Sequence, residues 1–231
     1  MGTIAIVMVF WGLAYSPWGI PGALGHGPFG GEEHAVARVQ ADAPGPGDAT
    51  AIRARLGALG VRAEVIEAGS GTLSLTLGGE ADVAEVLDAA LRPRRLALRR
   101  AFDEPADRPP DALRVEHCDG DGWCEEAWIG AVVMDGRHVA GAEAVRTDSG
   151  TAAVWVTFTA EGREVFGRWT TALVGRPFAI LIDDRLRSAP VVREPILGGR
   201  AMILVDEGFE EARVLAAALT HPVQGDWRVV P

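Results

Sequence analysis

Apolar residues in the first part of the chain recur with helical spacing in two places. Ile52, Leu56 and Leu59 lie at positions i, i+4 and i+7, which predicts a helix with one buried face. A second helix is predicted over residues 83–91, where Asp82 is a suitable N-cap because its carboxylate can accept from the first backbone N–H groups. Both segments are amphipathic, so both are expected to cover a sheet.

Apolar residues alternate with polar ones in the segments between and around these helices. This period of two predicts strands at residues 35–41, 61–68, 72–77 and 95–102. Gly69-Ser70-Gly71 separates the middle two and is typical of a hairpin. The order strand, helix, strand, strand, helix, strand is that of a ferredoxin-like sandwich, so residues 32–104 are predicted to form a ferredoxin-like base (βαββαβ).

The second part of the chain again mixes strand and helix patterns. Strands are predicted at residues 128–134 and 151–159, a helix over 161–173, and further strands at 178–182 and 201–205. The helix has an apolar stripe that includes Phe166 and Trp169, which is typical of a helix packed on a sheet. A last amphipathic helix is predicted over 209–219.

Proline-rich residues 105–112 are predicted to link the base to a head subdomain formed by residues 113–205. The last helix and a strand, within 206–231, are expected to return to the base. The predicted fold is therefore α+β, a ferredoxin-like base with an inserted second α+β head subdomain.

Residues 1–31 carry no charged side chain, and residues 3–15 are strongly apolar. Pro17 and Pro21 end this run before it reaches the length of about 20 residues that a spanning helix needs. A secretory signal and a membrane anchor both remain open. Either predicts an extracytoplasmic (periplasmic) location, with membrane contact only through this segment.

Composition and motifs argue against nucleic-acid binding, cofactor binding and catalysis as functions of this chain. The 231 residues are 48% hydrophobic with a net charge of −10, so a sizeable core is expected and nucleic acid is not expected as a partner. No glycine-rich phosphate loop and no clear arrangement of nucleophile and base is present, so we predict neither a cofactor nor catalysis.

Cysteine occurs twice, in the sequence CDGDGWC, as Cys118 and Cys124. In an exported protein such a pair is typical of one disulfide, which is our prediction. The alternative is an extracytoplasmic metal- or small-ligand-binding protein that uses His117, Cys118 and Cys124. The Cys-x5-Cys spacing departs from common zinc motifs and no fourth ligand is obvious, so no metal site is predicted.

The order of several motifs resembles the first large extracytoplasmic domain of SecD, a membrane subunit of the protein translocase. The similar segments are Ile52 to Val61, Leu96 to Arg99, Val154 to Phe166, Gly175-Arg176-Pro177, Ser188-Ala189-Pro190, Glu194-Pro195-Ile196, Gly198 to Ala201, and Phe209 to Ala212. Each segment alone is a weak signal. Their common order over most of the chain makes coincidence an unsatisfactory explanation.

This resemblance implies a non-catalytic role in protein export, in which the domain binds translocating polypeptide or a Sec translocase subunit. In the family the chain continues into membrane helices that carry the proton-coupling acidic residue. This sequence ends at Pro231, so we do not expect energy transduction within it.

Candidate contacts for an unfolded or translocating polypeptide are the edge segment Ser188 to Ile196, where prolines limit pairing and leave backbone groups available to an extended chain, and Phe178 outside it. The predicted contact residues are Phe178, Ser188, Ala189, Pro190, Val191, Val192, Pro195 and Ile196.

Overall fold

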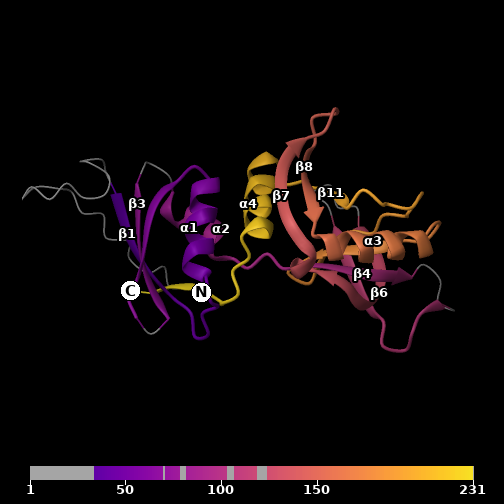
Figure 1. Cartoon of the computed structure of the whole chain (residues 1–231), viewed down its shortest axis with the longest axis horizontal. Coiled ribbons are helices and arrows are strands. Elements are labelled where there is room, and N and C mark those ends of the chain that lie inside the picture. Colours follow the sequence, from indigo (N-terminus) through magenta and orange to yellow (C-terminus); the bar gives the residue numbers. More distant parts are fainter. Residues whose placement is uncertain (1–33, 70, 79–81, 103–106, 119–123, 231) are drawn as a thin grey trace, which may run out of the picture. The chain divides into compact units, whose positions relative to one another are not determined.

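The computed structural model describes residues 34–69, 71–78, 82–102, 107–118 and 124–230 (Figure 1). The chain divides into two compact units. Unit 1 comprises residues 1–92 and 223–231, and unit 2 comprises residues 93–222. Unit 2 is thus inserted into the sequence of unit 1.

The described residues of unit 1 form a four-stranded antiparallel sheet with two helices. Its strands follow the order β12-β1-β3-β2 across the sheet. Its elements in chain order are β1 (His34–Gln40), α1 (Asp48–Ala58), β2 (Arg62–Glu67), β3 (Thr72–Gly78), α2 (Val83–Leu91) and β12 (Arg228–Val230).

One apolar core joins both helices of unit 1 to the same side of the sheet. Ile52 and Leu56 of α1 and Leu87 of α2 are buried together with Val39 and Leu75 of the strands. The predicted N-cap of α2 is confirmed, since the Asp82 carboxylate accepts from the backbone N–H of Ala84 at 2.9 Å.

Where unit 2 is described, it contains a five-stranded sheet, a three-stranded sheet and two α-helices. The sheet orders are β10-β9-β4-β6-β5 and β11-β8-β7. The elements are β4 (Leu96–Phe102), β5 (Leu113–Cys118), β6 (Cys124–Asp135), β7 (Val139–Arg146), β8 (Ala152–Phe158), α3 (Ala160–Ala172), β9 (Phe178–Ile182), β10 (Arg185–Ser188), β11 (Arg200–Leu204) and α4 (Phe209–Thr220), with a 3-10 turn at Gly136–His138.

The strand predicted to close the base lies in unit 2 instead. β4 pairs with β9 on one side and β6 on the other, and β12 occupies the position beside β1. The reason is that β4 has buried apolar residues on both faces. Leu96 and Leu98 enter one core cluster, whereas Ala101 enters another, and a strand buried on both faces belongs in the middle of a covered sheet.

Two further expectations about the connections differ from the structure. Residues 107–112 of the predicted linker lie between β4 and β5 of one sheet, so they do not separate the two units. Helix α4 packs in unit 2 rather than returning to the base. Ala212 and Leu215 share a core with Val154, and the Thr220 hydroxyl accepts from Ala142 N at 2.9 Å.

Candidate functional site

The predicted contact segment, residues 188–196, follows β10, and its residues 190–192 pair with residues 175–178. Phe178 N donates to Pro190 O at 3.1 Å, Val192 N donates to Arg176 O at 3.0 Å, and Gly175 N donates to Val192 O at 2.8 Å. Pro190 and Val192 therefore direct backbone groups inward, as alternate residues of a strand do. The segment is an irregular edge strand held by the residues that lead into β9.

Helix α3 fixes the far end of this segment. The Thr170 hydroxyl accepts from Ile196 N at 3.0 Å and donates to Phe166 O at 2.8 Å. Thr170 is fully buried, so this bond is shielded from water. Both ends of the segment are thereby attached to the core of unit 2.

Two of the predicted contact residues are core residues, which corrects the expectation for them. Phe178 is 5% exposed, and its ring centroid lies 5.4 Å from that of Trp169 and 6.0 Å from that of Phe166. Val192 is 3% exposed. Their side chains stabilise the platform beneath the segment and are not available to a partner in this conformation.

The other predicted residues lie nearer the surface. Pro190, Val191 and Pro195 are exposed, whereas Ser188, Ala189 and Ile196 are half-buried. Val191 is 53% exposed and forms an isolated bridge with Pro177. Within the described residues its N–H and C=O form no hydrogen bond, because they point away from the paired side.

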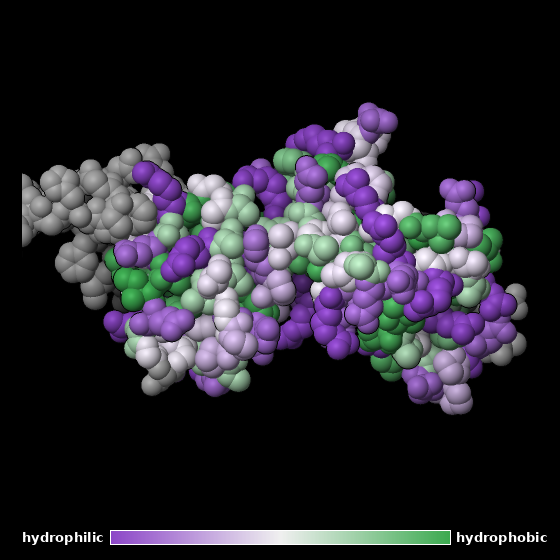
Figure 2. All heavy atoms as spheres, viewed as in Figure 1, coloured by the Kyte–Doolittle hydropathy of each residue, from purple (hydrophilic) through white to green (hydrophobic). Residues whose placement is uncertain are grey.

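Sequence reasoning missed two exposed apolar residues that flank the segment. Leu197 is 65% exposed and directly follows Ile196, and Val174 is 48% exposed and precedes Gly175. Figure 2 shows apolar surface interrupted by hydrophilic side chains in the part of the view where Figure 1 draws α3. Leu197 and Val174 each precede a glycine in a turn, and this position could have indicated their exposure in the sequence, since an apolar residue in a tight turn is hard to bury.

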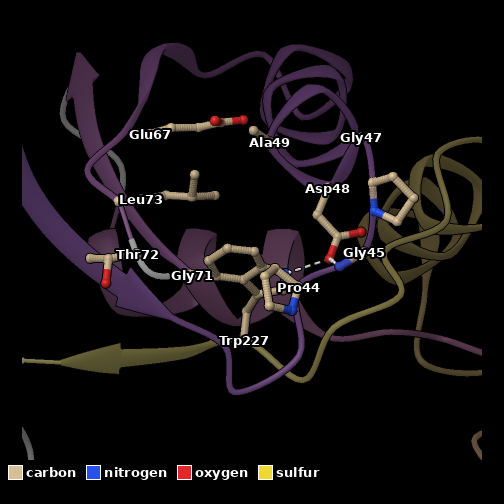
Figure 3. A pocket seen from close by; sticks show the side chains of 12 residues that line it. Pro44, Gly45, Gly47, Asp48, Ala49, Glu67, Gly71, Thr72, Leu73 and Trp227 are labelled. Atoms are coloured by element: carbon tan, nitrogen blue, oxygen red, sulfur yellow. Dashed lines mark hydrogen bonds between the residues drawn. The ribbon is translucent and has the colours of Figure 1, made fainter.

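Unit 1 has a pocket of about 440 Å³ that the sequence did not predict (Figure 3). It is lined by the loop around Pro44, the start of β3 at Leu73, and Trp227, which precedes β12. Asp48, the first residue of α1, lies at its wall and is 2% exposed.

The Asp48 carboxylate is saturated with hydrogen bonds. Its Oδ2 accepts from Gly45 N at 2.8 Å, Gly225 N at 2.9 Å and Trp227 Nε1 at 2.8 Å, and its Oδ1 accepts from Gln224 N at 2.9 Å. A carboxylate with these partners has a structural role, since it connects the loop before α1 to the chain before β12, and it is not available as a base.

Opposing effects act on the pKa of this carboxyl. Burial raises it, but the hydrogen bonds outweigh burial and hold the pKa of Asp48 below its usual value; they come from Gln224, Trp227, Gly45 and Gly225. The charged form is therefore the one that the fold stabilises.

The predicted disulfide and its metal alternative concern side chains outside the described part of the structure. The backbone of Cys118 lies directly opposite that of Cys124 in the β5–β6 pair. The side chains of His117, Cys118 and Cys124 are not described, so the disulfide stays a prediction. Among the described residues no group of three His, Cys, Asp or Glu side chains is placed to hold a metal ion.

Residues 1–31, predicted to be a signal or an anchor, also lie outside the described residues. In the ranges that the structure does describe, no helix has the length and apolar character needed to cross a membrane.

Comparison with known proteins finds a family match for the part of the chain that contains the candidate segment. Residues 125–221 match the family model of the SecDF, P1 head subdomain. The resemblance to SecD is confirmed. The P1 head match includes α3, β9 and residues 188–196, so the candidate segment belongs to the SecDF-like part of the chain.

Relatives match over a similar length. SecDF of Thermus thermophilus is 37% identical over 91 residues, which are 39% of this chain and 12% of that protein. SecD of Acidaminococcus fermentans is 37% identical over 90 residues, 39% of this chain and 22% of the relative. The match thus spans less than a quarter of either relative's length.

Two solved structures share the fold over a greater length. A crystal structure of SecDF in a super-membrane-facing form has a TM-score of 0.67 at 22% identity and covers 87% of this chain and 30% of that one. A structure of SecDF, described as a membrane component that enhances protein export, has a TM-score of 0.65 at 23% identity over 85% of this chain and 98% of that one. The mixed α/β fold of both units is therefore similar to that of SecDF.

Proposed function

We propose that the chain is a non-catalytic, SecD-like extracytoplasmic domain that takes part in protein export. The P1 head match supports this role, because the relatives are subunits of the protein translocase. The proposed partners are translocating polypeptide or a Sec translocase component, and the apolar residues 1–31 are proposed to export or anchor the chain.

Unit 1 is proposed to be the ferredoxin-like base. Supporting this, β1, β2, β3 and β12 stand in the order 4-1-3-2 when counted along the chain, and α1 and α2 follow the first and third strands. In this arrangement β12, rather than β4, is the fourth strand of the base.

The proposed contact surface is formed by Ser188, Ala189, Pro190, Val191, Pro195 and Ile196. One observation carries the proposal. Val191 offers an exposed apolar side chain and outward backbone groups, while Val192 and Thr170 hold the same segment on the core. The outward N–H and C=O of Val191 are groups with which an extended chain can form main-chain hydrogen bonds.

A photo-crosslinking amino acid placed at Val191 of the full chain in cells tests this function. We expect crosslinks to exported precursor proteins that disappear when export is blocked. The matched control is the same amino acid at Val192, which is the next residue but is buried. Equal yields at the two positions, or precursor crosslinks that do not depend on export, would contradict the proposal.

A further inference from the structure

One edge strand of unit 2, β11, offers a second candidate binding surface, which the proposed function does not include. In the part of the chain that the structure describes, three sheets have two edges each and thus six edge strands. An open edge invites pairing with another chain, and proteins normally protect it with charges, cover or very short length. Five of the six are protected in one of these ways.

Charged side chains lie on three of these edges, and two of the three, β5 and β10, also contact each other. Arg62 and Glu64 lie on β2, Arg114 on β5, and Arg185 and Arg187 on β10. The strand β12 has three residues only. The edge of β7 is covered by α4, whose Thr220 hydroxyl bonds both Ala142 N and Ala142 O.

The edge of β11 has none of these protections along most of its length. Residues 201–204 are Ala-Met-Ile-Leu and carry no charge, and among the described residues no strand pairs with the outer side of β11. Met202 is 42% exposed and Leu204 is 54% exposed, so the edge is also open to solvent.

The backbone of β11 shows which residues face outward. Gly199 O accepts from Phe158 N, and Val205 N donates to Ala152 O, both at 2.9 Å. Odd-numbered residues therefore direct their N–H and C=O toward β8. Arg200, Met202 and Leu204 direct theirs to the open side, because the direction alternates along a strand.

The side chains of these same three residues share one face of the sheet. Met202 lies opposite Trp155 in the neighbouring strand, and the Arg200 guanidinium lies 4.9 Å from the centroid of the Trp155 ring. Arg200 forms no ion pair with any described residue. Backbone groups, an apolar strip and an unneutralised positive charge thus coincide on one strand.

We propose that the β11 edge binds an extended polypeptide segment as an added antiparallel strand. The preferred segment has apolar residues opposite Leu204 and Met202, followed two positions later by an acidic residue opposite Arg200. Apolar contacts with Met202, Leu204 and Trp155 and the charge of Arg200 provide the preference, and the main-chain bonds provide the attachment. This site is separate from residues 188–196 and does not depend on the function proposed for them.

Titration of the purified full chain with a synthetic peptide tests the site. The peptide carries valine, valine and glutamate at alternate positions with threonine between them and blocked ends, and binding is followed by fluorescence anisotropy. N-methylation of the valine and glutamate amides removes the N–H groups that face β11, so binding is expected to be lost. N-methylation of the threonine amides alters the far edge of the peptide, and binding is expected to persist.

Variants of the protein test the same geometry from the other side. Met202→Pro removes one outward N–H from an edge position where proline can be accommodated, and about tenfold weaker binding is expected. Met202→Ala keeps the N–H and is expected to bind more strongly than Met202→Pro. Arg200→Glu is expected to reverse the preference, so that a peptide with arginine in place of glutamate becomes the better ligand.

The outcomes are distinguishable. Equal effects of the two N-methylation patterns, or equal affinity of Met202→Pro and Met202→Ala, would overturn the proposal. A dimer in sedimentation that Met202→Pro dissociates would also overturn it, since the occupant would be a second copy of this chain. Crosslinking from Val191 is expected to be unaffected by Met202→Pro, so failure of either site can be recognised separately.

Discussion

Replacing Asp48 by Asn is expected to loosen the C-terminal strand of unit 1 without affecting unit 2. The carboxylate accepts four hydrogen bonds from residues that precede α1 or β12. An amide has one oxygen, so the Oδ2 position can keep its three donors only if the NH₂ group faces Gln224 N, donor against donor.

The magnitude follows from these bonds. Asp48→Ala leaves four donors without their partner, at about 1 kcal/mol each, which amounts to about 4 kcal/mol. Asp48→Asn loses one bond and the charge assistance of the others, so about 2–3 kcal/mol is expected. Either value is a large fraction of the 5–15 kcal/mol that is typical of a domain.

Hydrogen exchange read by mass spectrometry measures this effect locally. Peptides that cover residues 224–230 are expected to exchange faster in Asp48→Asn, while peptides that cover β9 serve as the internal reference. Asp42→Asn is the matched control, because Asp42 pairs with Arg228 of β12 at the exposed surface, where ion pairs contribute little. Equal acceleration in the two variants would refute the idea that the buried network holds β12.

Three other outcomes are expected. The pKa of Asp48 is lowered in the folded protein, so its carboxylate stabilises unit 1 fully at a pH above the unfolded-state pKa of about 4. This stabilisation is lost as the pH falls through the folded-state pKa. The urea midpoint of unit 1 should therefore fall more steeply with acid in the wild type than in Asp48→Asn. Gly162→Ala places a Cβ 2.6 Å from His138 O and should destabilise unit 2 by about 1–3 kcal/mol in thermal unfolding. Gly57→Ala has open space around its Cβ and should not destabilise the protein. Equal effects of the two substitutions would contradict the packing argument. Thiol counting on the unfolded, unreduced protein should find no free thiol, and Cys118→Ser should cost about 2–3 kcal/mol; two reactive thiols would exclude the disulfide.

Local signals in the sequence predicted many elements but not their partners. Helices α1, α2 and α3 and the β2–β3 hairpin lie close to their predicted positions, because caps, glycine turns and apolar spacing act within a few residues. The partner of β4 depends on which strands bury its two faces, and no local pattern specifies that. The strand β7 was missed because its sequence, VAGAEAVR, has small residues in place of a clear alternation.

The candidate segment was predicted by its prolines, but the burial of individual residues was not. Phe178 and Val192 look like available apolar contacts in the sequence, yet the packing of α3 places both in the core. Exposure is set by tertiary contacts, whereas strand and turn signals report only on the backbone. The same limit explains why the Asp48 network was missed, since its donors Gln224, Gly225 and Trp227 are more than 170 residues away.

The position of β12 also sets an order of assembly. A chain that emerges from a ribosome or a membrane channel with its N-terminus first releases every residue of unit 2 before the strand that completes the sheet of unit 1. Until then the sheet of unit 1 has three strands, and the side of β1 that later pairs with β12 is vacant. Synthesis that stalls shortly before residue 228 would therefore yield a unit 2 with all its strands and a unit 1 in which β1 still exposes unpaired backbone groups.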